Sequence, residues 1–167
     1  MTEHKEKDRE NDRQIVRKIK NGTVIDHITA GKAIQVMEIL DLFHEKDMVA
    51  LLMNASSEKD ENGKKDVLKV AGRSLSSSEL NAISLVAPHA TINIIDNYHV
   101  EQKYQVEIPE WFRGIAKCPN IQCITNHDIV ETEFQVFVKE EPLRVMCTFC
   151  ERIIDADSLS IHIGKRG

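Results

Sequence analysis

Hydrophobic positions along the first two thirds of the chain alternate between the periods of strands and of helices. A β-type run at 23–28 is followed by apolar residues at helical spacing over 33–40. The apolar run 48–53 predicts a buried strand, and the alternating residues at 66–71 predict a second one. A polar segment containing Asn62-Gly63 separates them, so these two strands are expected to form a hairpin.

A second helix and another strand are predicted after the hairpin. Ser76 and Glu79 have the spacing of a capping box, and an apolar helical face then runs to Pro88. The β-branched segment 91–100 predicts one further strand. This order of elements is the split βαβ arrangement, an antiparallel sheet with both helices on one face. We therefore predict an α+β, ferredoxin-like βαββαβ sandwich for residues 14–106.

The hydrophobic pattern changes near residue 107, and this change predicts a domain boundary. Residues 107–167 alternate as in a small β-rich domain, and a unit of about sixty residues usually needs a metal ion or disulfides to be stable. The segment 100–111 contains one proline and no glycine, so it is expected to be a stiff connection between the domains. Residues 1–13 have mixed charge and no apolar period, which predicts a mobile arm.

Composition and charge narrow the class of protein. The chain has 22 Lys+Arg against 27 Asp+Glu, and its net charge of -5 opposes binding to a nucleic-acid backbone. It contains no apolar run of membrane-spanning length and no signal-peptide pattern, so we expect a cytoplasmic protein without a membrane partner. Phosphate-binding glycine loops, a nucleophile elbow and a His-Glu-x-x-His motif are also absent from the sequence. No enzymatic activity is predicted.

Four cysteines in two close pairs are the strongest chemical signal. Cys118 and Cys123 form a C-x4-C step, and Cys147 and Cys150 form a C-x2-C step. Cytoplasmic thiols stay reduced, and a β-hairpin between the pairs would gather four thiolates in the tetrahedral geometry that Zn²⁺ accepts. A complete cysteine set makes His127 unnecessary as a ligand and leaves no position for water, so the site is predicted to be structural. Two disulfides, a redox-active Cys147/Cys150 pair and an iron centre are the alternatives.

Polar residues on the predicted strands form a second, weaker candidate site. Asp26 and His27 are adjacent in the first strand and are therefore expected to point to opposite faces of the sheet. If the strands share one sheet, one of these two residues could join Lys69, Asn93 and Lys103 around a common anionic ligand. The alternative interpretation is an ordinary solvated surface.

Several separated motifs resemble the regulatory chain of aspartate carbamoyltransferase. In chain order they are Asn21–Ile28, Lys65–Val70, Ala87–Tyr98, Cys118-Pro119-Asn120 and Cys147-Thr148-Phe149-Cys150. The resemblance implies an N-terminal allosteric domain that binds the nucleotide effectors CTP and ATP. It also implies a C-terminal domain with one structural Zn²⁺, which docks on the catalytic chain of the first committed step of pyrimidine biosynthesis. The regulatory chain itself would not catalyse.

The resemblance also implies a nucleotide site. The residues expected to form it are Val16, Ile19, Asp26, His27, Lys69, Asn93, Ile95, Tyr98, Val100 and Lys103. In the family, the positions matching Asp26, Lys69 and the segment around Val16 contact the ribose. Those matching Ile19 and Tyr98 read the base through backbone groups, and those matching His27 and Lys103 approach the phosphates. The remaining three line the pocket.

The resemblance further implies an assembly in which six regulatory chains, as three homodimers, hold two catalytic trimers in a hetero-dodecamer. The main alternative is a zinc-ribbon module that binds nucleic acid or another protein. Residues 107–167 contain seven Lys+Arg against ten Asp+Glu, so they lack the basic face that nucleic-acid binding needs. A stand-alone metalloenzyme is disfavoured because no ligand position would be open.

Overall fold

The computed structural model describes residues 16–163, which form two compact units. One unit contains the described residues up to Leu75 together with His89–Val106. The other contains Ser76–Pro88 and the described residues from Glu107 onward. The chain therefore passes between the units at three points, and the segment 100–111 is not their only covalent connection. The predicted arm, residues 1–13, lies outside the described residues.

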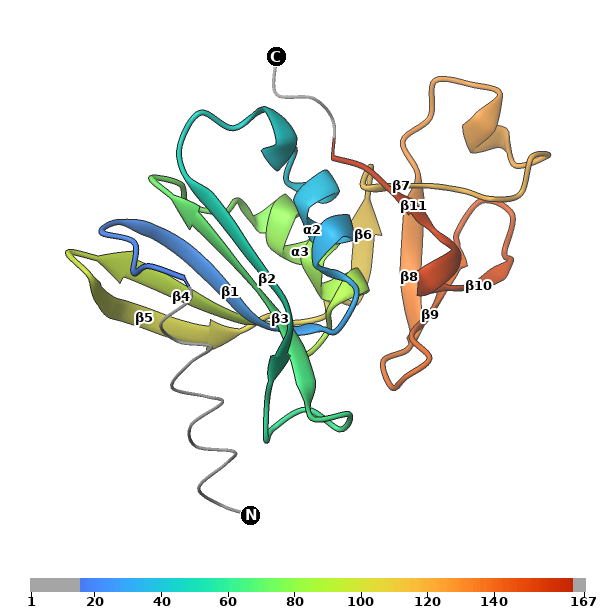
Figure 1. Cartoon of the computed structure of the whole chain (residues 1–167). Coiled ribbons are helices and arrows are strands. Elements are labelled where there is room, and N and C mark those ends of the chain that lie inside the picture. Colours follow the sequence, from blue (N-terminus) through green and yellow to red (C-terminus); the bar gives the residue numbers. More distant parts are fainter. Residues whose placement is uncertain (1–15, 164–167) are drawn as a thin grey trace. The chain divides into compact units, whose positions relative to one another are not determined.

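A five-stranded antiparallel sheet is the framework of the first unit (Figure 1). Its order is β2-β3-β1-β4-β5, and its strands are β1 (Gly22–Thr29), β2 (Val49–Ser56), β3 (Lys64–Ala71), β4 (Thr91–Asp96) and β5 (His99–Gln105). The predicted hairpin is present, since β2 pairs antiparallel with β3. Because β1 lies between β3 and β4, the first four strands have the split βαβ order, which confirms the predicted α+β class.

The prediction of a single strand over 91–100 is wrong, because the chain reverses within it. β4 ends at Asp96, Asn97 and Tyr98 have φ of 46° and 68°, and β5 returns beside β4. Positive φ at both central residues is typical of the two-residue turn that closes an antiparallel hairpin. Every residue of β5 is exposed, so this strand has no buried face to produce an apolar alternation. Strand β5 occupies about half of the segment 100–111, which was expected to be a connection between the domains.

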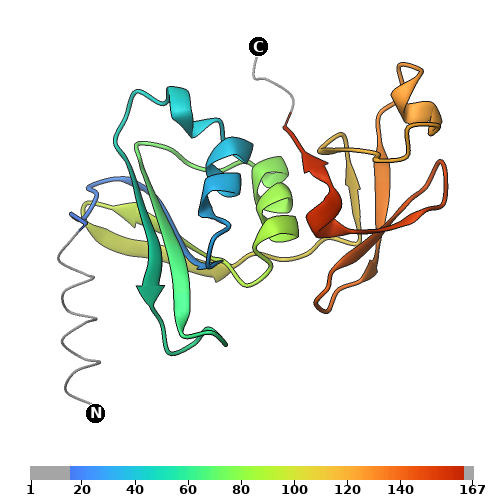
Figure 2. The same ribbon diagram turned by 45° about the vertical axis from the view of Figure 1, so that its right-hand side comes forward.

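Helix α2 (Ala33–Ile39) covers part of one face of this sheet (Figure 2). Its buried residues are Ala33, Val36 and Ile39, at the helical spacing that predicted it. The 3-10 helix η1 (Leu42–His44) follows α2. The fully buried side chains of Ile25 in β1 and Leu68 in β3 are opposite each other and point to the same, apolar face of the sheet.

The carboxylate of Asp66, in β3, ties three parts of the first unit together. Its side chain is fully buried. One oxygen accepts hydrogen bonds from the backbone N–H groups of Gly31, at 2.8 Å, and Ala33, at 3.2 Å, where α2 begins. The other oxygen accepts from the backbone N–H of Asn54, at 2.9 Å. Since α2 has no side-chain cap at its own N-cap position, Asp66 satisfies donors that the helix leaves unpaired.

Both neighbours of β3 contain a β-bulge. The register of β1 against β3 shifts between Ile25 and Ile28, and that of β2 against β3 shifts between Leu52 and Ala55. In each bulge one residue has positive φ, 55° at His27 in the first and 58° at Asn54 in the second. A bulge inserts an extra residue and redirects the side chains around it. The first bulge decides which way His27 points.

The second unit contains one helix and several short strands. Helix α3 (Ser77–Val86) begins with the predicted capping box. The Ser76 N–H donates to Glu79 Oε2 at 2.7 Å, and the Glu79 N–H donates to Ser76 Oγ at 3.3 Å. The remaining elements are β6 (Trp111–Arg113), β7 (Ala116–Lys117), η2 (Ile124–Asn126), β8 (Glu133–Val138), β9 (Arg144–Cys147), β10 (Ile153–Asp155), η3 (Ala156–Ser158) and β11 (Ser160–Ile161).

These strands form two small sheets, with the orders β10-β9-β8-β6 and β11-β7, which agrees with the predicted β-rich domain. The buried face of the larger sheet carries Phe112, Phe134 and Val145. The Phe112 and Phe134 rings lie 6.4 Å apart between centroids. The other buried apolar residues after β6 include Ile115, Leu143, Ile154 and Leu159. Cys147, at the end of β9, is opposite Phe134 in this sheet. Across residues 16–163, no helix has the length and apolar character needed to span a membrane.

Candidate functional site

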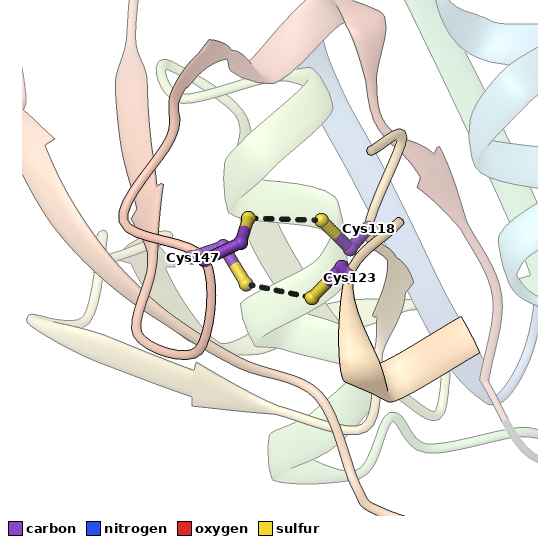
Figure 3. A group of neighbouring side chains, drawn as sticks. Cys118, Cys123 and Cys147 are labelled. Atoms are coloured by element: carbon purple, nitrogen blue, oxygen red, sulfur yellow. Dashed lines mark hydrogen bonds between the residues drawn. The ribbon is translucent and has the colours of Figure 1, made fainter. Parts of the chain in front are cut away.

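The four cysteines of the second unit meet in one cluster. Cys118 follows β7, Cys123 precedes η2, Cys147 ends β9, and Cys150 lies in the turn before β10. Their four Sγ atoms lie within 4.8 Å of one another. Figure 3 shows the sulfur atoms of Cys118, Cys123 and Cys147 directed into the same space. The β8–β9 hairpin joins the two cysteine steps, as the sequence analysis predicted.

The spacing of the sulfur atoms fits a tetrahedral metal ion. Cys118 Sγ lies 3.7 Å from Cys150 Sγ, and Cys123 Sγ lies 3.8 Å from Cys147 Sγ (Figure 3). Four sulfurs at about 2.3 Å from a central Zn²⁺ would be separated by about 3.8 Å along each edge of the tetrahedron. A disulfide needs about 2.0 Å, and all four cysteines are free. The arrangement therefore fits a single metal ion and not two disulfides.

The electrostatics of the cluster also favour a bound cation. Burial raises the pKa of the Cys118 thiol to about 12 and also raises the pKa of Cys147. At Cys150 burial acts in the same direction, but hydrogen bonds from the Arg152 backbone and the Asn120 side chain outweigh it and lower the pKa to about 7. Four thiolates so close together repel one another. A divalent cation removes that repulsion and displaces the thiol protons.

Polar side chains fix the loop that carries Cys118 and Cys123. The Thr125 hydroxyl donates to Cys123 Sγ at 3.2 Å. The Asn126 amide donates to the carbonyl of Cys118 at 3.0 Å and to that of Asn120 at 2.7 Å. His127 Nε2 lies 2.6 Å from the Ile121 carbonyl oxygen. The His127 side chain therefore contacts the loop backbone. Within the described residues, the cluster of possible metal ligands consists of cysteines only.

A second candidate site is a hollow on the first unit with a volume of about 650 Å³. All ten residues that the resemblance assigned to a nucleotide site line it: Val16, Ile19, Asp26, His27, Lys69, Asn93, Ile95, Tyr98, Val100 and Lys103. They come from the segment before β1 and from four of the five strands or their turns. Residues that are distant in sequence therefore share one surface of this unit.

Strand register explains why these residues meet. Lys103 on β5 is opposite Asn93 on β4, and Asn93 is opposite Val24 on β1. Val24 is in turn opposite Lys69 on β3, and Lys69 is opposite Ala50 on β2. Residues directly opposite each other in a sheet point to the same face. This row of five residues therefore forms the floor of the hollow, on the face away from Ile25 and Leu68.

The expectation that Asp26 and His27 point to opposite faces is wrong. Both line the hollow. The bulge in β1 and the positive φ of His27 interrupt the alternation, so two consecutive side chains reach the same side of the sheet. The Asp26 carboxylate accepts a hydrogen bond from the His27 backbone N–H at 2.7 Å, which holds the two residues in this conformation.

The hollow is basic although the chain as a whole is acidic. Its lining contains two acidic side chains, those of Asp26 and Glu58. It also contains five lysines: Lys18, Lys59, Lys65, Lys69 and Lys103. Lys65 Nζ lies 2.7 Å from Asp26 Oδ1. Lys69 Nζ donates to the carbonyls of Val16 and Arg17, both at 3.4 Å, and burial lowers the pKa of Lys69 although Asp26 opposes this. Such a surface suits an anionic ligand with several negative charges.

Three of these lysines were not among the predicted site residues. Lys65 is on the same face of β3 as Val67 and Lys69, so period-two alternation from Lys69 could have identified it. Lys18 and Lys59 lie outside regular strands, where no period connects them to the other residues of the hollow. Ser57 and Glu58 also line the hollow. They belong to the loop between β2 and β3, whose position depends on tertiary contacts and not on a sequence period.

Two family models together match most of the chain. Residues 14–107 match the family model described as "Aspartate carbamoyltransferase regulatory chain, allosteric domain", and residues 110–160 match the one described as "Aspartate carbamoyltransferase regulatory chain, metal binding domain". The chain belongs to the family of aspartate carbamoyltransferase regulatory chains. It is thus a member of a family of regulatory, non-catalytic subunits that associate with a catalytic chain.

Regulatory chains of aspartate carbamoyltransferase from several organisms are similar to this chain. The aspartate carbamoyltransferase regulatory chain of Pyrococcus abyssi is 49% identical over 147 residues, which cover 87% of this chain and 95% of the relative. The regulatory chain of Methanothermobacter thermautotrophicus is 46% identical over 145 residues, covering 86% and 91%. That of Sulfolobus acidocaldarius is 44% identical over 150 residues, covering 89% and 90%. The similarity therefore includes both the allosteric and the metal-binding domain.

Proposed function

We propose that the hollow of the first unit binds the effectors CTP and ATP in competition, and that the chain transmits their binding to the catalytic chain of aspartate carbamoyltransferase in pyrimidine biosynthesis. The observation that carries this proposal is that all ten expected nucleotide-binding residues line one hollow, together with five lysines. The hollow is also large enough for a nucleotide, since ligand sites commonly measure about 300–1,000 Å³.

The proposed roles follow the chemistry of each side chain. His27 and Lys103 bind the phosphates, because N–H donors form strong charge-assisted hydrogen bonds with phosphate oxygens. Asp26 and Lys69, with the backbone near Val16, bind the ribose. The Lys69 bonds to the carbonyls of Val16 and Arg17 support this role, because they bring that segment to the floor of the hollow.

The base is assigned to the remaining part of the hollow. Ile19 and Tyr98 read it through backbone groups, and the side chains of Asn93, Ile95 and Val100 line the space around it. The backbone N–H of Tyr98 donates to the Lys20 carbonyl at 2.9 Å, so the turn between β4 and β5 is already attached to the segment before β1. This attachment supports a preformed base pocket.

For the second unit we propose one structural Zn²⁺, held by Cys118, Cys123, Cys147 and Cys150. The sulfur spacing and the all-cysteine donor set support zinc. A bound Zn²⁺ would supply charge neutralisation and a rigid crosslink. Through the metal, the four cysteines would hold the loop after β7 close to the end of β9. Thr125 and Asn126 orient that loop through hydrogen bonds.

We further propose that residues 14–106 are the nucleotide-binding domain and that residues 107–167 dock on the catalytic chain. Ser76–Pro88, inside the proposed nucleotide-binding domain, belongs to the second compact unit. The exposed isoleucines of the second unit support docking, since Ile121 is 80% exposed and Ile129 is fully exposed near the cysteine loop. The proposed assembly is the hetero-dodecamer of three regulatory homodimers and two catalytic trimers. Reduced cysteines as metal ligands support a cytoplasmic location.

Calorimetric titration of the full chain with CTP, ATP and cytidine tests the proposed site. Lys103→Ala should weaken CTP far more than cytidine, because its proposed partner is phosphate. Lys69→Ala should weaken both, because its proposed partner is the sugar. Lys46→Ala is the control, since Lys46 is exposed and does not line the hollow. Wild-type chain that binds neither CTP nor ATP would disprove the proposal, and equal losses for CTP and cytidine in the Lys103 variant would remove Lys103 from the phosphate site.

A further inference from the structure

The loop between β2 and β3 brings an acidic side chain onto one of the proposed phosphate-binding residues. Asp60 Oδ2 lies 2.9 Å from His27 Nδ1. The hydroxyl of Ser57 donates a short hydrogen bond to the same oxygen. Only 18% of the Asp60 side chain and 15% of the His27 side chain are exposed. The carboxylate is therefore seated against His27 and is not a freely solvated surface group.

The loop is built so that Asp60 keeps this position. The Ser57 N–H donates to the Gly63 carbonyl at 2.9 Å, and the Gly63 N–H donates to the Asp60 carbonyl at 2.8 Å. These two bonds connect the ends of the loop, so the backbone at Asp60 is held by the residues on both sides of it. Ser57 and its neighbour Glu58 both line the hollow. Movement of Asp60 would therefore change the wall of the hollow.

The groups around Asp60 are those that would hold any anion at this point. Burial acts to raise the pKa of Asp60, but hydrogen bonds from Ser57 and His27 and the charges of His27 and Lys65 outweigh burial and lower it. Carboxylate and phosphate oxygens accept hydrogen bonds from the same donors. Asp60 occupies Nδ1 of His27, and Asp26 Oδ2 lies 3.9 Å from Nε2, so each ring nitrogen faces a carboxylate. A ligand phosphate that binds at Nδ1 must therefore compete with the carboxylate of Asp60.

We propose that Asp60 is an internal competitor for the phosphate groups of the nucleotide, and that binding of a phosphate to His27 displaces the Asp60 carboxylate together with its loop. This inference rests on the proposed function of the hollow. It makes Asp60 a determinant of specificity, because a nucleoside without phosphate has no group that competes for His27. It also couples occupancy of the phosphate position to the conformation of the β2–β3 loop.

The test compares two variants that change the net charge by the same amount. Asp60→Asn keeps the size of the side chain and removes its charge. Glu61→Gln removes one negative charge from the adjacent position, which is exposed and has no contact with His27. Both variants lower the net negative charge of the chain by one. The difference between them therefore isolates the contact of Asp60 with His27.

Calorimetry on the full chain would use CTP, cytidine and inorganic tripolyphosphate. We expect Asp60→Asn to bind CTP and tripolyphosphate about tenfold more tightly than Glu61→Gln does, the size expected for one competing charge-assisted hydrogen bond. Cytidine affinity should be equal in the two variants. Ser57→Ala, which removes one donor from the Asp60 carboxylate, should give a smaller gain in the same direction. Thermal unfolding would verify that each variant is folded.

Other outcomes overturn the inference, the proposed function or both. Equal CTP and tripolyphosphate affinities in Asp60→Asn and Glu61→Gln would show that Asp60 does not compete. Weaker binding in Asp60→Asn would make Asp60 a part of the binding site. If the wild-type chain bound tripolyphosphate but no nucleotide, the proposed function would fail, while the tripolyphosphate comparison would still decide the role of Asp60. Binding of neither probe to any variant would disprove both proposals.

Discussion

The cysteine cluster and the lysine-lined hollow are positioned by different means. The cluster draws its four possible ligands from two short steps, and its geometry fits one metal ion that would crosslink them. The hollow draws its residues from positions 16 to 103, and its floor is one row of residues across a five-stranded sheet. That sheet has its own buried core and the fully buried Asp66.

The two sites should therefore differ in what a disruption changes: the stability of the fold at one site and the affinity for a ligand at the other. Removal of the metal should take away folding free energy, because metal binding to the four cysteines is coupled to the folding of a small unit. Removal of a residue from the hollow takes away affinity, because the sheet stays folded without it. The following predictions test this contrast, from the largest expected effect to the smallest.

Chelation of the metal, or Cys147→Ser, should unfold the two small sheets of the second unit. Structural zinc contributes roughly 10–16 kcal/mol of apparent binding free energy in small zinc-dependent domains, more than the core of such a domain provides. Hydrogen exchange should show loss of amide protection over β6 to β11, while the strands of the first unit remain protected. Restoring Zn²⁺ to the chelated wild type is the control. Retained protection over β8 and β9 after chelation would contradict a structural role for the metal.

Asp66→Ala should destabilise the first unit by about 3 kcal/mol, because it leaves three backbone donors without their acceptor. Chemical denaturation followed by circular dichroism would measure the change. Asp96→Ala, which removes an exposed carboxylate from the same unit, should change the free energy of unfolding by less than about 0.5 kcal/mol. A loss of metal binding in the Asp66 variant would contradict the separate origin of stability in the two units.

Lys65→Ala should weaken CTP binding by about 2 kcal/mol, or roughly thirtyfold, and leave the fold intact. The variant removes a cation from the hollow and also leaves Asp26 without its partner at 2.7 Å. Lys64→Ala is a matched control, since Lys64 is the adjacent residue of β3 and does not line the hollow. Calorimetry should detect the difference. The same CTP affinity in both variants would exclude Lys65 from the anion-binding surface.

Thr125→Val should lower metal affinity on the order of tenfold, since groups that hydrogen-bond to metal ligands commonly affect affinity by that amount. Its hydroxyl donates to Cys123 Sγ at 3.2 Å. Competition with a chromophoric chelator would measure the affinity. Thr148→Val is the control, because the Thr148 hydroxyl donates to the Glu133 carbonyl and not to a sulfur. Equal affinities in the two variants would mean that the Thr125 bond does not affect the ligand.

Local features of the chain were determined by the sequence itself. The capping box at Ser76, the helical spacing of α2 and the hairpin turn near Gly63 each depend on residues within a few positions of one another. The cysteine steps belong to the same class, because each step defines half of a tetrahedral site by itself. For such features the interacting groups are close in the chain, so their spacing directly reports the geometry.

Only the tertiary structure decided how distant residues combine. The register of five strands aligned Lys69, Asn93 and Lys103 in one row, and no local period contains that register. The bulge at His27 brought two adjacent side chains to one face, because an extra residue in β1 breaks the alternation of a regular strand. The edge strand β5, with no buried face, had no apolar pattern to predict it. The loop that sets Asp60 against His27 is likewise fixed by contacts between residues 33 positions apart.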